Sequence, residues 1–453
     1  MKKLLFLIFA FLLTTQTIKA QVVLDANGVT IKWTGTTVPS PYFIQASPRG
    51  TLEWFAIVSD ATKGNINSYA KNVQLGKNYF TPPGRLTPVP FNNIVTTLVT
   101  DMNSWFNYAS VFNQPIDSWD VSNVTDMSLM FYRASAFNQL ISSWNVSNVT
   151  DMDSMFTSTK FNQNISSWNV SNVTKMTSMF NQATSFNQNI SSWNVSKVTD
   201  MSFMFRQARL FNQNISSWNV SNVTDMSYMF QLAAFNQPID SWNVSKVTDM
   251  AFMFNQATSF NQPLGSWDVS NVTDMSYTFY KASSFNQPIG NWDVGNVTSM
   301  INMIRDSKLS IANYDTLLTG WSTITSAETP LKQGVVFDAG SSKYCKGASA
   351  RDSLISKYGW TITDGGFDCT ISGVEELEES KLKLYPNPVE SILNINIDYN
   401  LIDEPYAIFD NLGRVVLEGK FKEVESTINL KELSKGIYYL KVSNSHSSKF
   451  IKE

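Results

Sequence analysis

The sequence is poor in the residues that most catalytic and metal sites require. Its 453 residues include one histidine and two cysteines, and the histidine, His446, lies seven residues from the end. A Ser-His-Asp triad, a Cys-His pair or a multi-histidine metal site could draw only on that residue, and a four-cysteine metal site is impossible. We therefore expect a protein without enzyme activity, cofactor or metal site.

Charge is also scarce. Charged residues make up 16% of the chain, and 34 Lys and Arg oppose 37 Asp and Glu, for a net charge of −3. This balance leaves no basic field for nucleic acid. Aromatic residues reach 13%, which argues against bulk disorder. The length allows about three domains at roughly 150 residues each.

The first twenty residues are typical of a secretory signal peptide. Lys2 and Lys3 precede an apolar run over residues 4–13, and Ala20 supplies the small residue at the expected cleavage site. The run is too short to cross a membrane, which takes about 20 apolar residues, and no other segment is longer. We expect a secreted chain that begins near Gln21 and has no membrane span.

Secretion affects the expectation for the two cysteines. In an oxidising compartment Cys345 and Cys369 are expected to form a disulfide, with two free thiols as the alternative.

The middle of the chain is a repeat of 24 or 25 residues. A tryptophan marks each unit, at Trp119, Trp144, Trp168, Trp193, Trp218, Trp242, Trp267 and Trp292. One unit has the form FNQ-x-I-x-x-W-[ND]-V-S-x-V-T-D-M-S-x-M-F-x-x-A, and every methionine except the first lies in it. Such a period predicts a solenoid or an array.

The pattern inside the unit predicts its structure. Ile165, Trp168 and Val170 have the spacing of a leucine-rich-repeat strand. Thr224 is a favourable helix N-cap, and apolar residues over 226–233 recur at i, i+3, i+4 and i+7. We therefore expect an α/β repeat solenoid, leucine-rich-repeat-like, with about 25 residues per coil. Tryptophan and methionine are expected in its core rather than in a sugar platform or a metal site.

Three polar columns repeat with the unit. The asparagine of Phe-Asn-Gln is expected to form a ladder that satisfies backbone groups between coils. The aspartates after Val-Thr are interpreted as favourable charges at helix N-termini, with calcium binding as an alternative. The threonines are interpreted as N-caps, with ice binding as an alternative.

Packing does not explain a row of aromatic residues between the two methionines. At helical spacing this position lies roughly 160–200° from the core face. We expect an outward aromatic row on a rigid array to be a partner or ligand site, with two alternatives, a groove filled by a neighbouring loop and surface aromatics without a common role. The row consists of Phe203, Tyr228, Phe252 and Tyr277. Two further residues, Arg206 and Tyr280, could frame it.

The repeats resemble the BspA-like leucine-rich-repeat surface proteins, whose unit is W-[DN]-V-S-N-V-T-[DN]-M-S-x-M-F followed by F-N. The resemblance covers roughly residues 86–372 and implies adhesion or protein binding at a cell surface. Residues 21–95 are expected to form a β-rich N-terminal cap, residues 96–304 the solenoid, and residues 305–372 a C-terminal cap secured by the disulfide.

The last part of the chain differs in composition. No glutamate occurs between Glu53 and Glu328, whereas eleven follow Val374. After a charged linker at 373–381, short alternating runs over 382–453 predict an Ig-like β-sandwich. This region resembles the C-terminal sorting domain of the bacterial type IX secretion system. The motif residues that carry the resemblance are Tyr385, Pro386, Asn387, Pro388, Gly413, Gly436, Tyr438 and Lys441.

Together these features predict a non-catalytic protein at the outer surface of a Gram-negative bacterium. It would bind host or environmental proteins or neighbouring cells as an adhesin, and the type IX machinery would be a further partner. The alternative is a carbohydrate-binding or polysaccharide-scaffolding surface protein. A glycan-cleaving enzyme would need a pair of carboxylates in a cleft. The only candidate pairs are Asp117 with Asp120 and Asp240 with Asp249.

Overall fold

The computed structural model describes residues 21–323, 328–369, 383–397, 401–411, 414–442 and 446–453. The expected signal peptide, the linker at 373–381 and Gly413 lie outside the described residues. The chain divides into two compact units, one ending at Asp368 and one beginning at Cys369. Within the described part of the chain, no helix has the length and apolar character needed to cross a membrane.

The first unit begins with two small β-sheets. In one, β1 pairs antiparallel with β2. In the other, β4 pairs antiparallel with β3 and parallel with β5. The strands are β1 (Val22–Leu24), β2 (Ile31–Trp33), β3 (Phe43–Ala46), β4 (Glu53–Ser59) and β5 (Ile94–Leu98). A turn joins β1 to β2, in which Gly28 donates its N–H to the carbonyl of Asp25 at 3.0 Å and has a φ of 74°.

Two helices join these strands, which the β-rich expectation did not include. They are α1 (Lys63–Lys71) and α2 (Val73–Phe80), and two short 3₁₀ turns flank them, η1 (Asp60–Thr62) and η2 (Phe91–Asn93). Asn72 separates the helices, and its side-chain oxygen accepts the N–H of Gln74 at 2.8 Å, which caps α2. The helices contribute Tyr69 and Phe80 to the core that continues into the repeats.

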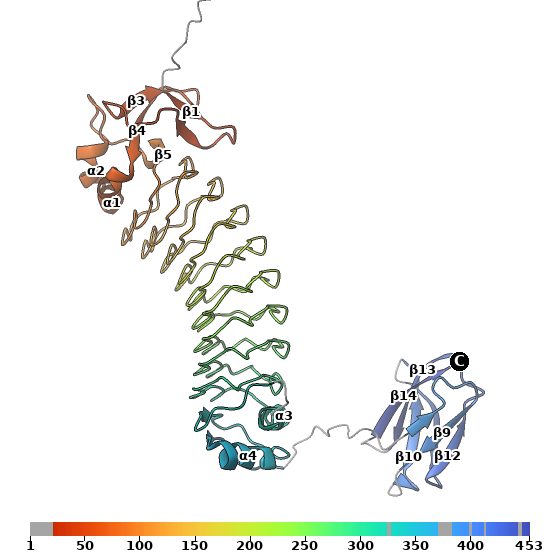
Figure 1. The fold of residues 1–453 in the computed structure, drawn as a ribbon. Helices are drawn as coiled ribbons and strands as arrows, with labels where there is room; N and C mark the ends of the chain where they lie inside the picture. Colours follow the sequence, from red (N-terminus) through yellow and green to blue (C-terminus); the bar gives the residue numbers. More distant parts are fainter. Residues whose placement is uncertain (1–20, 324–327, 370–382, 398–400, 412–413, 443–445) are drawn as a thin grey trace, which may run out of the picture. The chain divides into compact units, whose positions relative to one another are not determined.

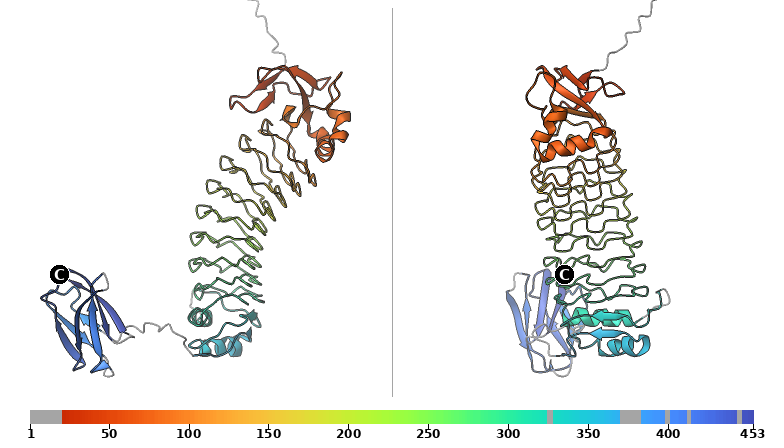
Figure 2. Two further views of the ribbon diagram at one scale, coloured as in Figure 1. Left: turned by 180° about the vertical axis from the view of Figure 1, so that it is seen from behind. Right: turned by 90° about the vertical axis from the view of Figure 1, so that its left-hand side faces the viewer.

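The repeats form a stack of coils, each lying on the next with its turns in register (Figures 1 and 2). One parallel bridge per coil joins the residues of the aspartate column, from Asp101 and Asp126 through to Asp274 and Ser299. We interpret this stack as a solenoid.

The coils contain no α-helix and no extended strand within residues 101–310, so the helix and the strand expected in each unit are wrong. Residues 226–233 instead form consecutive turns, in which Tyr228 and Leu232 have φ values of 59° and 57°. The N–H of Met229 bonds to the carbonyl of Met226 at 3.2 Å, three residues back, rather than four as in an α-helix.

The backbone N–H groups of this segment alternate between two partners. Tyr228 and Leu232 each donate to the next coil at 2.9 Å, and Phe230 between them does the same. Gln231 and Ala233 donate within their own coil, at 3.1 and 3.0 Å. Every donor is therefore satisfied without a helix, since a neighbouring coil supplies half of the acceptors.

The threonine and aspartate columns also have different roles from those expected. Thr224 donates its N–H and its hydroxyl to the carbonyl of Thr199, at 2.8 and 3.1 Å, so it joins coils and caps no helix. Asp225 accepts the N–H of Ser227 at 2.8 Å, which is an Asx-turn rather than a charge at a helix end.

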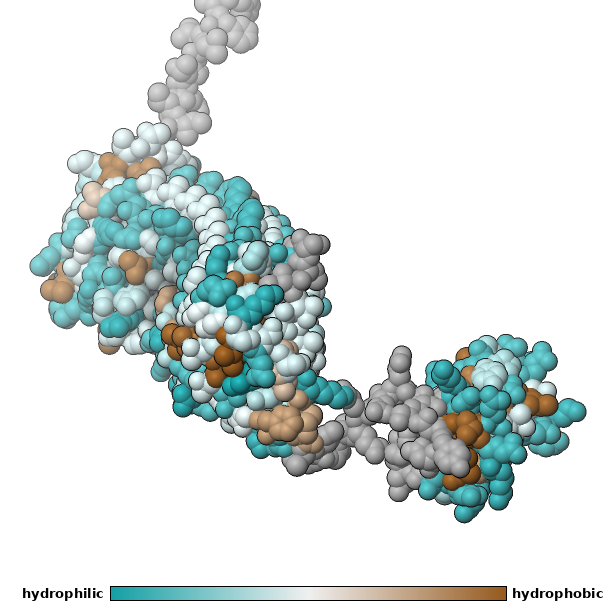
Figure 3. Space-filling view, turned by 60° about the horizontal axis from the view of Figure 1, so that its bottom comes forward, coloured by the Kyte–Doolittle hydropathy of each residue, from teal (hydrophilic) through white to brown (hydrophobic). Residues whose placement is uncertain are grey.

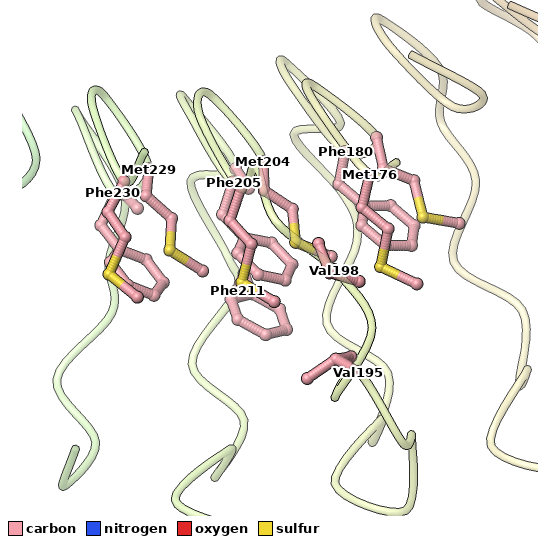
Figure 4. Packing of buried hydrophobic residues seen from close by; sticks show 14 of the residues in the cluster. Met176, Phe180, Val195, Val198, Met204, Phe205, Phe211, Met229 and Phe230 are labelled. Atoms are coloured by element: carbon pink, nitrogen blue, oxygen red, sulfur yellow. The ribbon is translucent and has the colours of Figure 1, made fainter. Parts of the chain in front are cut away.

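The expectation of a tryptophan, methionine and phenylalanine core is confirmed. These side chains are buried in one continuous cluster along the stack, and Figure 4 shows Met204, Phe205 and Phe211 packed between neighbouring coils. From Trp144 to Trp292, the indole N–H of each repeat reaches a carbonyl of the preceding coil, as when Trp218 donates to Ile190 at 3.0 Å. The indole N–H of Trp105, before the first full repeat, is buried without a partner among the described residues. Burial of both the ring and its polar atom excludes the tryptophans as a sugar platform.

The asparagine ladder is confirmed as well. Asn212 accepts the N–H of Asn236 through Oδ1 at 2.8 Å and donates its own N–H to Asn187 at 3.0 Å. The same contact recurs along the stack as far as Ser310, which donates to Asn286 at 2.8 Å. The side chain therefore supplies an acceptor to a backbone group that no carbonyl reaches.

A compact region closes the C-terminal end of the stack. It contains α3 (Ile311–Ser322), β6 (Val336–Asp338), α4 (Ala348–Tyr358) and β7 (Thr361–Thr363), with β6 parallel to β7. Trp321 of α3 donates to the carbonyl of Ile289 at 3.2 Å and so extends the tryptophan column by one position. The expected disulfide between Cys345 and Cys369 is present.

The second unit consists of two antiparallel sheets around one core. One sheet has the order β11-β10-β13-β14 and the other β12-β9-β8. The strands are β8 (Lys383–Tyr385), β9 (Ile392–Asn396), β10 (Pro405–Phe409), β11 (Val415–Lys420), β12 (Glu425–Asn429), β13 (Gly436–Val442) and β14 (His446–Lys452). Leu393, Ile408 and Leu440 from both sheets share the core, and we interpret the unit as an Ig-like sandwich.

Candidate binding surface

The four aromatic residues of the predicted row occupy equivalent turn positions in successive coils. Phe203, Tyr228, Phe252 and Tyr277 have φ values of 58–59°. In this left-handed conformation each ring projects from its turn. Its position in the repeat lies between the two buried positions that methionine usually occupies. The row therefore points away from the core because of turn geometry, and not because of helical periodicity as the sequence suggested.

The structure brings the four rings together in one stack. Ring centroids lie 4.4 Å apart between Phe203 and Tyr228, 4.5 Å between Tyr228 and Phe252, and 4.5 Å between Phe252 and Tyr277. The rings are parallel within 8°. All four are half-buried. Because each inner ring is covered on both faces, the outer surface of the row presents ring edges.

The framing residues predicted from the sequence lie beside this row. Tyr280 contacts the end of the stack, with its ring 5.5 Å from Tyr277 in an edge-on arrangement, and the Lys281 ammonium lies 5.0 Å from the centre of the Tyr280 ring. Arg206 donates through Nε to Gln231 at 2.6 Å, and Gln231 donates to Asn255 at 3.2 Å. The guanidinium of Arg206 is thus held by a polar chain that runs along the row.

A column of carboxylates follows the other side of the row. Asp200, Asp225, Asp249 and Asp274 lie three residues before the rings of their coils, and each accepts a backbone N–H two residues ahead through Oδ1 at 2.7–2.8 Å. Burial raises the pKa of Asp249, and repulsion from Asp225 and Asp274 raises it further. These charges are close enough to interact along the array.

The hydroxyl of Tyr228 lies within this electrostatic environment. Burial raises its pKa, Arg206 lowers it, and Asp249 and Asp274 raise it. Arg206, Asp249 and Asp274 therefore lie close enough to Tyr228 to act electrostatically on its hydroxyl.

A second aromatic cluster lies near the start of the array, and the sequence reasoning did not identify it. Tyr108 and Tyr132 meet edge-on at 5.5 Å, and the Arg133 guanidinium lies 5.4 Å from the centre of each ring. Tyr108 is 54% exposed. The spacing of 24 residues between the two tyrosines, which is the spacing of the repeat, was the signal that could have revealed the pair.

Outside the row, hydrophobic side chains are scattered. In the face drawn in Figure 3, hydrophobic residues form small separate spots on a mostly hydrophilic surface. Among the residues that the structure describes, no group of three or more His, Cys, Asp or Glu side chains is arranged to hold a metal ion.

Several motif residues of the expected sorting domain have structural contacts. Asn387 accepts the N–H of Ile451 at 2.9 Å, which ties the segment before β9 to β14. Tyr438 is buried and donates its hydroxyl to the carbonyl of Ser434 at 2.8 Å, as in a tyrosine corner. The motif prolines Pro386 and Pro388 both follow cis peptide bonds.

Other motif residues face solvent. Tyr385 is 49% exposed, and Gly436 and Lys441 are also exposed. Their part in a sorting signal stays a prediction.

Comparison with known proteins identifies both units. Three overlapping segments, residues 86–160, 143–234 and 218–317, match a family described as "Mycoplasma protein of unknown function, DUF285". Together they span more than half of the 453 residues. The chain belongs to the DUF285 family. The DUF285 repeats include all four rings of the row, and the family's description assigns them no function.

The second unit has a separate match. Residues 383–453 match the secretion system C-terminal sorting domain. The chain is therefore a DUF285 surface repeat protein with a type IX sorting tail, which directs it to the outer surface of a Gram-negative cell. No curated protein and no solved structure matches the chain.

Proposed function

We propose that this DUF285 protein is a non-catalytic, adhesin-type interaction protein of the cell surface. It binds host or environmental proteins, or neighbouring cells, through the aromatic row formed by Phe203, Tyr228, Phe252 and Tyr277. The sorting domain places the array outside the cell, where such contacts occur. The BspA-like resemblance of the repeats supports the same role.

The single observation that carries this proposal is the continuity of the row. Four rings at a regular spacing of 4.4–4.5 Å form an apolar ridge on a stack of hydrogen-bonded coils. Aromatic side chains are enriched at protein interfaces because they contribute a large contact area at little conformational cost. A ridge held by its own stacking has little side-chain entropy left to lose on binding.

The same geometry favours a protein partner over a glycan at this row. Sugar rings stack on the faces of aromatic side chains, whereas both faces of Tyr228 and Phe252 are covered by their neighbours. The alternative of glycan binding fits a different place, an open groove of about 330 Å³ on the array. It is lined by uncharged polar side chains, namely Asn189, Ser191, Gln213, Asn214, Ser216 and Ser217.

The test compares two variants of the full chain against panels of matrix proteins and glycans. In the row variant, Phe203, Tyr228, Phe252 and Tyr277 are all replaced by Ser. The control variant replaces the exposed apolar residues Val111, Leu140, Leu210 and Leu86 by Ser. Circular dichroism and thermal melting check that both variants fold.

We expect the wild-type chain and the control variant to bind a protein of the panel, and the row variant to lose that binding. Equal binding by both variants would show that the row is not the site. Binding to glycans alone, lost when Asn189 and Asn214 are replaced by Ala, would favour the carbohydrate alternative.

A further inference from the structure

The chemistry of the partner follows from the groups on the two sides of the row, and this inference rests on the proposed function. Each of the four coils presents one ring edge and, three residues earlier, one half-buried carboxylate. The Oδ1 atom of each carboxylate is engaged by its Asx-turn. Among the described residues, no donor reaches the Oδ2 atoms of Asp200, Asp225, Asp249 or Asp274.

The array itself contains one lysine whose ammonium contacts a carboxylate of the aspartate column. In one coil the aspartate is replaced by Lys175, and its ammonium lies 2.9 Å from Oδ2 of Asp151 in the preceding coil. The lysine side chain remains 62% exposed while it makes this contact. An ammonium group can therefore approach Oδ2 from solvent, and the backbone of the coil does not block it.

The opposite side of the row does not neutralise the carboxylates in its centre. At the positions that follow the rings, cationic side chains occur in the two end coils, where Arg206 and Arg209 follow Phe203, and Lys281 follows Tyr277. One further lysine of a central coil, Lys246, precedes Asp249 by three residues, and its ammonium donates to Asn222 at 2.7 Å. In the two central coils the corresponding positions hold the neutral residues Gln231 and Asn255. Burial raises the pKa of Asp249, and repulsion from the carboxylates of Asp225 and Asp274 raises it further.

We propose that the row and its carboxylate column receive Lys or Arg side chains from a cationic surface of the partner protein. The aliphatic stem of each such side chain lies across a ring edge, and its charged head meets the adjacent Oδ2. Lys and Arg suit this arrangement because they combine an apolar stem with a charged tip. The apolar ridge supplies contact area, and the column selects for positive charge.

The test uses the full chain and poly-L-lysine as probe, with poly-L-glutamate as the reference polymer of opposite charge. One variant replaces Asp200, Asp225, Asp249 and Asp274 by Asn, which keeps an oxygen for each Asx-turn and removes four charges. The matched control removes the same number of charges from exposed positions of the same unit, by replacing Asp240, Asp268, Asp306 and Asp352 with Asn.

We expect poly-L-lysine to bind the wild-type chain, and poly-L-glutamate not to bind. The column variant should lose about tenfold in affinity and the control variant much less, with the difference shrinking at high salt because exposed charges are screened. Equal losses in both variants would overturn the inference, since they would reflect overall charge alone. Absence of poly-L-lysine binding would overturn it as well.

A second measurement separates this inference from the proposed function. The column variant is tested against the protein identified with the wild-type chain and the aromatic row variant. Loss of binding in both variants supports the inference. If the aromatic row variant loses the partner and the column variant retains it, the row is a binding site whose partner is not recognised by charge.

Discussion

At the scale of single residues, the left-handed turn positions are the feature that most distinguishes these coils. Two residues per coil have positive φ, for example Phe203 and Gln207 at 59° and 57°, and none of them in the repeats is glycine. For an L-residue this conformation costs about 1–2 kcal/mol. The hydrogen bonds that each such residue gives to the next coil must offset this cost.

This cost leads to a prediction for Gln207, whose N–H donates to Gln231 at 2.7 Å. Replacement by Gly should stabilise the array by about 0.5–1 kcal/mol, because glycine adopts positive φ without a steric penalty. Replacement by Val should destabilise it, since a β-branched side chain tolerates this conformation least. Chemical denaturation of the two variants, with Gln207→Ala as reference, measures both effects. Equal stability of the Gly and Val variants would contradict the assigned backbone conformation.

The asparagine ladder permits a second prediction at this scale. Asn212→Ala removes the acceptor of the Asn236 N–H and should cost about 1–2 kcal/mol of unfolding free energy. Asn212→Asp keeps an oxygen in the same place and should cost less. Thermal melting of the two variants at neutral pH gives the comparison. An Ala variant as stable as the wild type would mean that water replaces the side chain.

At the scale of the structural element, the sequence predicted which residues of each coil are buried and which point outward better than it predicted the backbone conformation. The core residues, the asparagine ladder and the outward aromatic row follow from positions in the repeat. The helix did not follow, because spacing of i, i+3, i+4 and i+7 over residues 226–233 fits two consecutive turns as well as an α-helix. Non-glycine residues such as Tyr228 and Leu232 give no local sign of positive φ.

The stacking of the rings was likewise not predictable from one unit. Periodicity shows that Phe203 and Tyr228 occupy equivalent positions, but their ring separation of 4.4 Å depends on the distance between coils. That distance is set by hydrogen bonds from coil to coil, such as the one from the N–H of Tyr228 to the carbonyl of Ala251 at 2.9 Å. A unit built from a strand and a helix would form a different set of hydrogen bonds between coils.

The carboxylate column gives a prediction on pH dependence. Burial, then repulsion from Asp225 and Asp274, raises the pKa of Asp249 above its ordinary 3.8 in the folded state. A carboxyl with a raised folded pKa is disfavoured in its charged form, so its contribution to stability is greatest below pH 3.8 and falls as the pH rises through the folded pKa.

Asp249→Asn should therefore be more stable than the wild type at pH 7, by about 0.5 kcal/mol for such a partly exposed group. The difference should vanish below the ordinary pKa, because the wild-type side chain is then neutral too. Denaturation curves at pH 7 and pH 3 test this. Asp268→Asn, which lies away from the column, serves as the control. A stability difference that persists at pH 3 would point to a cause other than charge.

At the scale of the whole molecule, the C-terminal region of the first unit closes one end of the stack of coils. The C-terminal region covers the last coil through Trp321 and holds itself together through buried polar contacts. Asp315 accepts three backbone N–H groups, from Cys345, Lys346 and Gly347, at 2.8–2.9 Å. Asp364 pairs with Arg351 at 2.7 Å.

The disulfide gives a prediction for this region. The bridge closes a loop of about 25 residues in the unfolded chain, and all of this loop except Cys369 belongs to the first unit. Replacing Cys345 and Cys369 together by Ser should therefore lower the unfolding free energy of the first unit by about 3 kcal/mol. The second unit has its own core and should melt unchanged. Differential scanning calorimetry of the full chain distinguishes the two transitions. If the transition of the sorting domain shifted instead, the disulfide would stabilise the second unit and the prediction would be wrong.

The bonds that join one coil to the next also bear on how such a protein changes over generations. Every internal coil offers its neighbour nearly the same acceptors and takes nearly the same donors, as Asn187, Asn212 and Asn236 do in turn. Duplication or loss of one unit in the gene therefore creates junctions that are chemically the same as those already present. The array can lengthen or shorten by whole coils, and with it the number of rings in the row, while both of its ends and its export signal remain as they are.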